Sequence, residues 1–334
     1  MAKRSLITLL ISVLTIVSVI AGVNYVVDPQ CYYQCPQLDV NKRTLNSYYQ
    51  VAQRILAHPD AEVIILGSSR GQTTPPLWVQ EVSGLKTLNL SAAGAEATTK
   101  LAFLKIAEEN IKLRKVIWLA DYFELVGETR DAKIKNTPAL KHFLKADDSF
   151  SVSDKLLALQ GLLDHNNLEA SLHFLKNRNQ TEITQGSGAE IDYRLCQSSD
   201  YQGNETAESL KKEVNLLYQS YVHGVISPEQ SRQAWTKFSD VMNALVAKGI
   251  EVQVVIIPYH PDFLARLKLE QPDIYQRHLN WIEQLKTLNK PGLSVADNFN
   301  GIAGADATHV NWNDGVHFNC RAAMLMLRPL ITPK

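Results

Sequence analysis

Short apolar runs alternate with helical patterns along most of this chain, and that alternation limits the folds open to it. A weaker apolar run at 293–296 follows a helical pattern at 272–288, and further helical patterns occur at 97–110 and 230–248. The stronger runs mostly lack the apolar–polar alternation of half-exposed strands, so they indicate strands covered on both faces. This succession predicts an α/β fold, an open parallel sheet with helices on both faces. The four stronger runs are residues 62–66, 86–90, 115–120 and 252–257.

Polar residues follow each of these four runs. In open parallel sheets, ligands bind outside the carboxyl ends of the strands. The sequence therefore predicts one functional site at that edge of the sheet. The residues that would meet there are Gly67-Ser68-Ser69-Arg70, Ser91-Ala92-Ala93-Gly94, Asp121-Tyr122 and Pro258-Tyr259-His260.

The N-terminus carries Lys3 and Arg4, followed by an apolar run that reaches Val27 without a charge. A run of about 20 apolar residues is enough to cross a bilayer core. Basic residues before such a run hold its N-terminus in the cytoplasm and place the remainder outside. The sequence predicts that residues 1–28 form an uncleaved signal anchor. A cleaved signal peptide ending near Ala21 and a buried core helix are the alternatives; the anchor is preferred because the run continues past Ala21.

The predicted organisation has three parts. Residues 1–28 form the cytoplasmic N-terminus and the anchor, 29–60 a stalk and a leading helix, and 61–334 the main domain, which contains the predicted site. An insertion at about 126–203 interrupts the strand–helix rhythm of that domain. Lys and Arg together number 34, as do Asp and Glu. A neutral balance argues against a nucleic-acid partner, which normally selects a basic surface.

The cysteines are even in number, which permits disulfides in an exported chain. The simplest pairing joins Cys31 to Cys35 and Cys196 to Cys320. Metal binding is the competing reading of Cys31-x-x-x-Cys35. No histidine neighbours that pair, so the sequence predicts no metal site and no cofactor.

Ser69 is the candidate nucleophile. A serine nucleophile needs a sharp turn that exposes its oxygen and leaves backbone N–H groups free for an oxyanion. Gly67-Ser68-Ser69 directly after a strand supplies such a turn, although the same tripeptide is also common as a plain turn or helix cap. Ser69 is preferred over Ser68, because Ser68 directly follows the turn glycine.

Two Asp-x-x-His pairs could activate the serine. They are Asp306/His309 and Asp314/His317. The second pair is preferred, because Gly315 allows the tight turn that folds the carboxylate onto the imidazole. His317 also leads into an apolar helical pattern that would fix its position. An Asp that orients a His, which deprotonates a Ser, is the arrangement of a nucleophilic triad.

These motifs in this order resemble the GDSL/SGNH hydrolase superfamily. The resemblance rests on Gly67-Ser68-Ser69, the segment Asn89–Gly94, and Asp314-Gly-Val-His-Phe-Asn319. It implies a flavodoxin-like three-layer α/β/α sandwich with a parallel central sheet. It also implies Ser69 as nucleophile, Asp314 and His317 as its acid–base pair, and the N–H groups of Ser69 and Gly94 as oxyanion donors.

The sequence departs from the family at Asp121. The family usually has an asparagine after its third strand that donates to the oxyanion, whereas an ionised aspartate only accepts hydrogen bonds. Losing one such donor costs about 2.7–4 kcal/mol of barrier. A non-catalytic envelope assembly or glycan-binding protein with the same fold is therefore the alternative to an enzyme.

The predicted anchor narrows the resemblance to SGNH-like proteins of bacterial envelopes, such as those of alginate O-acetylation and of teichoic acid D-alanylation. It implies a single-pass protein of the bacterial inner membrane whose catalytic domain lies in the periplasm. It would act as a serine esterase or O-acyltransferase on an acylated glycan or other envelope polymer, through an acyl-serine intermediate. A polytopic membrane acyltransferase is the implied partner.

Further residues are candidates for lining the pocket. Tyr122 and His260 follow strands, and a plain hydrogen-bonded role is the alternative for His260. Arg70 would neutralise an anionic substrate or pair with a surface carboxylate, and the second reading is preferred. Trp312, close to Asp314, is the candidate for stacking on a sugar.

Overall fold

The computed structural model describes most of the chain. The residues fall into two compact units, one of Met1–Gln53 with Asp131–Ile183 and one of Arg54–Arg130 with Thr184–Lys334. The described residues are 2–33, 35, 37–42, 44–125, 138–141, 152–176, 186–203, 205–224 and 231–332.

The larger unit contains a five-stranded sheet in the order β2-β1-β3-β4-β5, and every neighbouring pair is parallel. Nearly all residues of β1, β2, β3 and β4 are buried, so these four strands are covered on both faces of the sheet. The prediction of a parallel sheet is confirmed, and each strand end lies within one residue of its predicted position. The strands are β1 (Val63–Leu66), β2 (Thr87–Asn89), β3 (Lys115–Ala120), β4 (Glu251–Ile256) and β5 (Leu293–Asp297).

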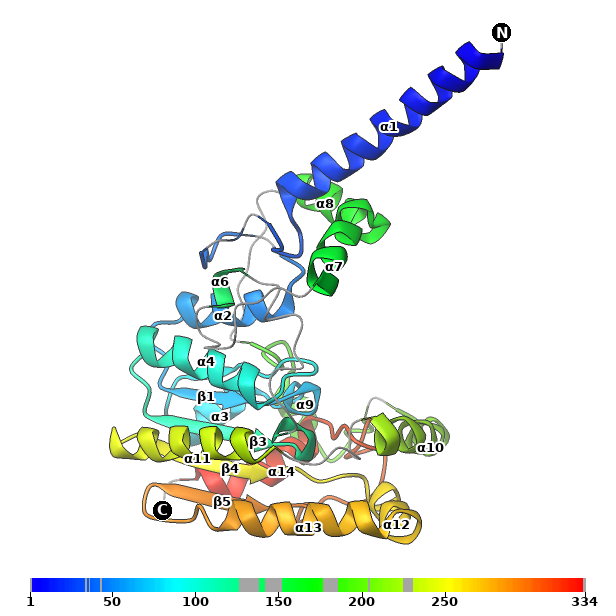
Figure 1. The fold of residues 1–334 in the computed structure, drawn as a ribbon. Coiled ribbons are helices and arrows are strands. Elements are labelled where there is room, and N and C mark those ends of the chain that lie inside the picture. The colour runs from blue at the N-terminus through cyan, green and yellow to red at the C-terminus, as the bar shows by residue number, and fades with distance from the viewer. Residues whose placement is uncertain are drawn as a thin grey trace. The chain divides into compact units, whose positions relative to one another are not determined.

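Helices cover both faces of this sheet (Figure 1). The chain leaves β1 through α3 (Pro76–Ser83) to β2, then passes through α4 (Ala97–Asn110) to β3 on the other side of β1. Right-handed crossovers in opposite directions place α3 and α4 on opposite faces. The contacts agree, because α4 packs against α11 (Arg232–Ala247) and α3 against α14 (Cys320–Ile331). The strand order reverses between β1 and β3, which is where open α/β sheets bind ligands.

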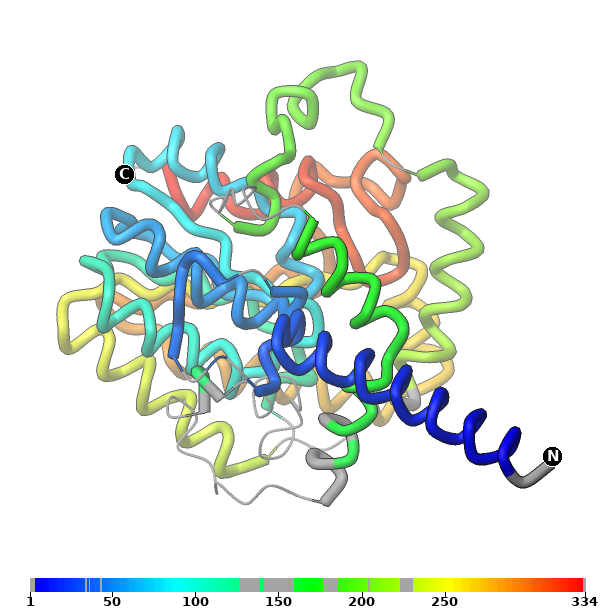
Figure 2. The backbone as a smooth tube through the Cα atoms, turned by 90° about the horizontal axis from the view of Figure 1, so that it is seen from above, coloured from blue at the N-terminus to red at the C-terminus, as the bar shows by residue number. Residues whose placement is uncertain are grey.

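The remaining elements of the larger unit lie around this framework. Figure 2 shows α10, in light green, beside the gold α12, and the two helices are in contact. The sequence patterns predicted α4, α11, α13 and α14 but not α3, α10 or α12. The bounds are η1 (Ser69–Gly71), η2 (Tyr122–Leu125), α9 (Tyr193–Gln197), α10 (Ala207–Gly224), α12 (Pro261–Glu270) and α13 (Pro272–Lys286).

The smaller unit begins with α1 (Ala2–Val27), which contains a stretch long and apolar enough to cross a membrane, Arg4–Val27, with mean hydropathy 2.7. Asp28 directly follows α1, and its φ of 46° lies in the left-handed region that terminates helices. Near its end, Asn24 donates to the carbonyl of Leu162 at 2.9 Å. The other helices are α2 (Ser47–Ala57), which continues into the larger unit, α6 (Pro138–Lys141), α7 (Val152–Leu163) and α8 (His165–Lys176).

The predicted insertion at about 126–203 divides between the two units. Residues 131–183 group with the N-terminal segment, whereas 186–203 belong with the sheet. Positions 126–137, 142–151 and 177–185 of that insertion lie outside the described residues.

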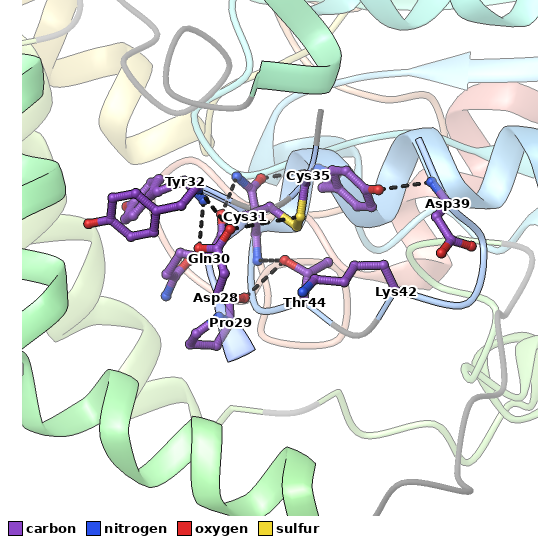
Figure 3. Close-up of a disulfide and its surroundings, with 12 residues drawn as sticks. Asp28, Pro29, Gln30, Cys31, Tyr32, Cys35, Asp39, Lys42 and Thr44 are labelled. Atoms are coloured by element: carbon purple, nitrogen blue, oxygen red, sulfur yellow. Dashed lines mark hydrogen bonds between the residues drawn. A yellow bond between two sulfur atoms is a disulfide. The ribbon is translucent and has the colours of Figure 1, made fainter. Parts of the chain in front are cut away.

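Both predicted cysteine pairs are confirmed as disulfides, with Cα–Cα separations of 5.2 Å for Cys31–Cys35 and 6.1 Å for Cys196–Cys320. Figure 3 shows the first of them beside Asp28, whose carboxylate accepts from the N–H groups of Tyr32 and Tyr33 at 2.8 and 2.7 Å. This disulfide therefore lies in a turn that is already closed by hydrogen bonds.

Candidate active site

The turn after β1 presents Ser69 at the carboxyl edge of the sheet. The hydroxyl of Ser68 accepts a hydrogen bond from the Arg70 N–H at 3.3 Å and so caps the short helix η1, which begins at Ser69. A Cβ on Gly67 or Gly71 would lie only 2.6 or 2.5 Å from the Ser91 hydroxyl oxygen. A side chain at either position would therefore press on the loop after β2.

The loop before α14 presents His317. Asp314 Oδ1 accepts from the backbone N–H groups of Val316 at 2.8 Å and His317 at 2.7 Å, which closes a tight Asx-type turn. At Gly315, a Cβ would lie 3.1 Å from the Cα of Val214 on α10, so a side chain there would push against that helix. Asn319 then caps α14 through the N–H groups of Arg321 and Ala322.

These two segments meet. Ser69 Oγ lies 2.9 Å from His317 Nε2, and His317 Nδ1 lies 2.7 Å from Asp314 Oδ2. The expected contacts of Ser69 with His317 and of His317 with Asp314 are thus confirmed. Burial raises the pKa of Asp314, but hydrogen bonds from the His317 side chain and from two backbone N–H groups outweigh it and leave the pKa below its ordinary value. The carboxylate is therefore ionised at neutral pH and can orient the imidazole.

The rival pair has other contacts. Asp306 Oδ1 accepts from Thr308 Oγ1 and from Asn311 Nδ2, at 2.5 and 2.8 Å. His309 contributes its backbone carbonyl to Asn319. The choice of Asp314/His317 over Asp306/His309 therefore agrees with the geometry.

Gly94 lies in the exposed turn that follows β2. Its φ of 75° is left-handed, and Ala95 N–H donates to the Ala92 carbonyl across the turn at 3.0 Å. The Ala92 N–H donates to the Gly67 carbonyl at 3.1 Å, which ties this loop to the serine turn. Across the described part of the chain, no hydrogen bond engages the N–H of Ser69 or of Gly94. Both groups are chemically able to donate to an oxyanion.

Asp121 follows β3, and both of its carboxylate oxygens are bonded to residues of the serine turn. Its Oδ1 pairs with Arg70 Nη1 at 2.6 Å, and its Oδ2 accepts from the Ser68 hydroxyl at 2.6 Å. Both charged side chains are about 1% exposed. The preferred expectation that Arg70 pairs with a carboxylate is confirmed, but this carboxylate is buried and not at the surface as expected. Asp121 accepts hydrogen bonds here and supplies no oxyanion donor.

A second buried ion pair adjoins the first. Lys100 of α4 pairs with Glu124 of η2, whose other oxygen accepts from Trp118 Nε1 at 2.9 Å. Glu124 also accepts from the Asp121 N–H at 2.7 Å. Burial raises the pKa of Glu124 to about 7, partly offset by Lys100. The sequence analysis missed this pair; a lysine among the apolar residues of α4 was the available signal.

Three other pocket candidates are buried, which corrects their predicted role. Trp312 is 1% exposed and donates through Nε1 to the Asp306 carbonyl at 3.1 Å, so it cannot stack on a sugar. His260 caps α12 by accepting from the Asp262 N–H and lies 3.1 Å from the Ala307 carbonyl, so its plain hydrogen-bonded role is confirmed. Tyr122 stacks on His278 with ring centroids 3.8 Å apart.

Tyr221 of α10 is a neighbour of the site that the sequence analysis missed. Burial raises the pKa of its hydroxyl; the negative charges of Asp121 and Asp314 add to the effect, and Arg70 opposes it. No sequence pattern singled out α10, so nothing drew attention to this tyrosine.

His278 gives a prediction about acid stability. Its ring is fully buried, Nδ1 donates to the Ile274 carbonyl at 2.8 Å, and Nε2 has no partner among the described residues. Burial lowers its pKa from 6.5 to about 4. The unfolded chain therefore binds more protons between these pH values, so this part of the stability is present above pH 6.5 and is lost as pH falls through about 4.

The expected size is about 2–3 kcal/mol of unfolding free energy between about pH 7 and pH 4.5, since one unit of pKa shift equals 1.36 kcal/mol. Urea titrations followed by tryptophan fluorescence at both pH values measure it. His278→Gln lacks the titrating group, so its loss over the same interval should be smaller by that amount. An equal loss in both proteins would contradict the prediction, whatever the substitution costs at pH 7.

Comparisons with known proteins add little. No family model matches the chain, and no curated protein matches it. One solved structure that matches is described as "a putative platelet activating factor from Streptococcus pneumonia"; it shares 11% identity, with a TM-score of 0.38, over 86% of this chain and 94% of that chain.

Among the described residues, no three His, Cys, Asp or Glu side chains are grouped closely enough to hold a metal ion. The functional argument therefore rests on the geometry of the site.

Proposed function

We propose that this chain is a serine esterase or O-acyltransferase of the SGNH type. One observation carries the proposal: the continuous hydrogen-bond chain Ser69–His317–Asp314, with separations of 2.9 and 2.7 Å. Supporting it are a parallel sheet with the reversal between β1 and β3, and a site assembled at the carboxyl ends of the strands. A three-layer sandwich of the flavodoxin-like kind is the fold that this proposal requires.

The proposed reaction has two steps. With Nδ1 protonated and bonded to Asp314, His317 Nε2 takes the proton of the Ser69 hydroxyl while Oγ attacks the acyl carbonyl. The carbonyl oxygen becomes an oxyanion, to which the N–H groups of Ser69 and Gly94 donate. The tetrahedral species then collapses; His317 returns the proton to the departing alcohol, and acyl-Ser69 remains. Water or an acceptor hydroxyl, deprotonated by His317, attacks the acyl-serine and releases the product with Ser69 restored.

The proposed setting is the periplasmic face of a bacterial inner membrane, with α1 as an uncleaved single-pass anchor. The length and apolar character of Arg4–Val27 support it, as do Lys3 and Arg4 at its cytoplasmic end. In that setting, the substrate is an acylated glycan or another envelope polymer. A polytopic membrane acyltransferase would supply or receive the acyl group.

A fluorophosphonate tests the nucleophile without knowledge of the natural substrate. The full chain in detergent should form one covalent phosphonyl adduct, because an activated serine attacks phosphorus and expels fluoride. Peptide mapping should place the adduct on Ser69. The neighbouring Ser68, whose hydroxyl is bonded to Asp121, is an internal control that should remain unmodified.

Absence of any adduct on folded protein would favour the alternative, a non-catalytic envelope assembly or glycan-binding protein. The observation that favours this alternative is Asp121, which holds Arg70 and Ser68 where the family places a third oxyanion donor. If Ser69 is labelled, an acceptor experiment separates the two enzymatic readings. A transferase should divert acyl groups from water to an added polysaccharide, whereas an esterase should release the same amount of free acid with or without it.

A further inference from the structure

Arg70 directly follows the candidate nucleophile, and its guanidinium contacts three other segments of the larger unit. Nε donates to the Val316 carbonyl at 2.8 Å, and Nη1 pairs with Asp121 at 2.6 Å. Nη2 donates to the Pro258 carbonyl beyond β4. The guanidinium carbon also lies 4.4 Å from the centre of the Tyr259 ring.

The bond to Val316 is the informative one, because Val316 directly precedes His317. The Arg70 backbone is fixed to the serine turn through the Ser68 hydroxyl, and its side chain holds the peptide that leads into the base. One side chain therefore links the backbone next to Ser69 to the backbone next to His317. Asp121 strengthens the link, since its second oxygen accepts from Ser68 and so holds the same turn.

The buried guanidinium cannot bind substrate, since Arg70 is 1% exposed. Its planar fork presents several donors in fixed directions, which a lysine ammonium cannot reproduce. Here those directions are used by one carboxylate and two backbone carbonyls. This arrangement fixes the distance between two loops rather than recognising a ligand.

We propose that Arg70 is a positioning residue that holds the loop of His317 against the turn of Ser69, and so sets the separation of nucleophile and base. The inference rests on the proposed function for its catalytic consequence, but the mechanical link itself does not. A misplacement of about 1 Å between reacting groups can cost about 100-fold in rate.

Two variants of the full chain test the proposal. Arg70→Lys keeps a positive charge beside Asp121 but cannot also reach both carbonyls. Arg70→Met/Asp121→Leu removes both charges, and replacing a buried ion pair by apolar residues of similar volume is often neutral for stability. In each folded variant, fluorophosphonate labelling of Ser69 should be about 100-fold slower than in the wild type.

Arg266 supplies the matched control. Its guanidinium also lies over a tyrosine ring, 4.0 Å from the centre of Tyr218, and it pairs with Glu270, but the described contacts do not join it to the His317 loop. Arg266→Lys and Arg266→Met should label at the wild-type rate. The proposal would be overturned if both Arg70 variants fold and their Ser69 is labelled at a rate within about threefold of wild type. So small a change is far below the rate loss expected from misplaced reacting groups.

Hydrogen exchange separates this proposal from the proposed function. In both Arg70 variants, the amides of residues 311–318 should exchange faster than in the wild type while those of β1 and β3 keep their protection. If wild-type protein is not labelled at all, the proposed function fails and the exchange result alone decides the role of Arg70. Unchanged exchange in this loop would overturn the inference. Loss of folding in both variants would also overturn it, because Arg70 would then support the whole unit rather than position one loop.

Discussion

Ser69→Ala is expected to lower kcat for a small activated acyl ester by about 10³–10⁴-fold. Removing the serine of a complete triad costs about 10⁶ in kcat. In the proposed enzyme, one missing oxyanion donor already lowers the wild-type kcat by about 10²–10³, so less catalysis is left to lose. That donor is missing because Asp121 only accepts hydrogen bonds, from Arg70 and Ser68. Initial rates of ester cleavage by the full chain in detergent measure both proteins.

His317→Ala should cause a loss of the same size, and the double variant should be no worse than either single one, because groups that act as a unit give non-additive losses. His309→Ala is the matched control, since it removes the histidine of the rival Asp-x-x-His pair and should leave the rate unchanged. A loss on His309→Ala, with an active His317→Ala, would mean that the wrong pair has been assigned to Ser69.

The strands and the contacts among Ser69, His317 and Asp314 could be predicted because each leaves a local signal. A strand buried on both faces must be almost wholly apolar, so β1 and β3 stand out from the sequence as short uninterrupted runs. Asp-Gly-x-His is local too. Its aspartate folds onto the N–H of the histidine within the same turn, as Asp314 and His317 do. The sheet then brings distant segments together at one edge.

The ion pair below the site could not be predicted in the same way. Arginine and aspartate are rarely fully buried, so from the sequence alone Arg70 and Asp121 are expected at the surface. Only the fold brings them together as a buried pair. Trp312 was misjudged for a related reason. It lies in a loop, where exposure is expected, but a bridge between Trp312 and Phe318 closes the loop and the ring is buried. α10 gave no signal strong enough to be predicted, and it carries Tyr221 to the site.

Removal of the disulfide Cys196–Cys320 is expected to have the largest effect on the unfolding free energy. This disulfide joins α9 to the first residue of α14 across a sequence separation of 124 residues. A cross-link that closes a loop of about 100 residues stabilises by about 4.7 kcal/mol, chiefly by restricting the unfolded chain. Cys196→Ala/Cys320→Ala should therefore lower the unfolding free energy of the larger unit by about 4–5 kcal/mol.

Tryptophan fluorescence is the suitable measurement, because all five tryptophans belong to the larger unit. The second disulfide provides the control: Cys31 and Cys35 are separated by only 4 positions and lie in the smaller unit. Closing so short a loop stabilises by about 2 kcal/mol. That contribution belongs to the smaller unit, whereas the tryptophan fluorescence reports on the larger unit. Cys31→Ala/Cys35→Ala should thus leave the fluorescence transition in place, while the Cys196/Cys320 double variant shifts it to much lower denaturant. If the two double variants shift the transition equally, loop closure by Cys196–Cys320 is not what stabilises the sheet unit.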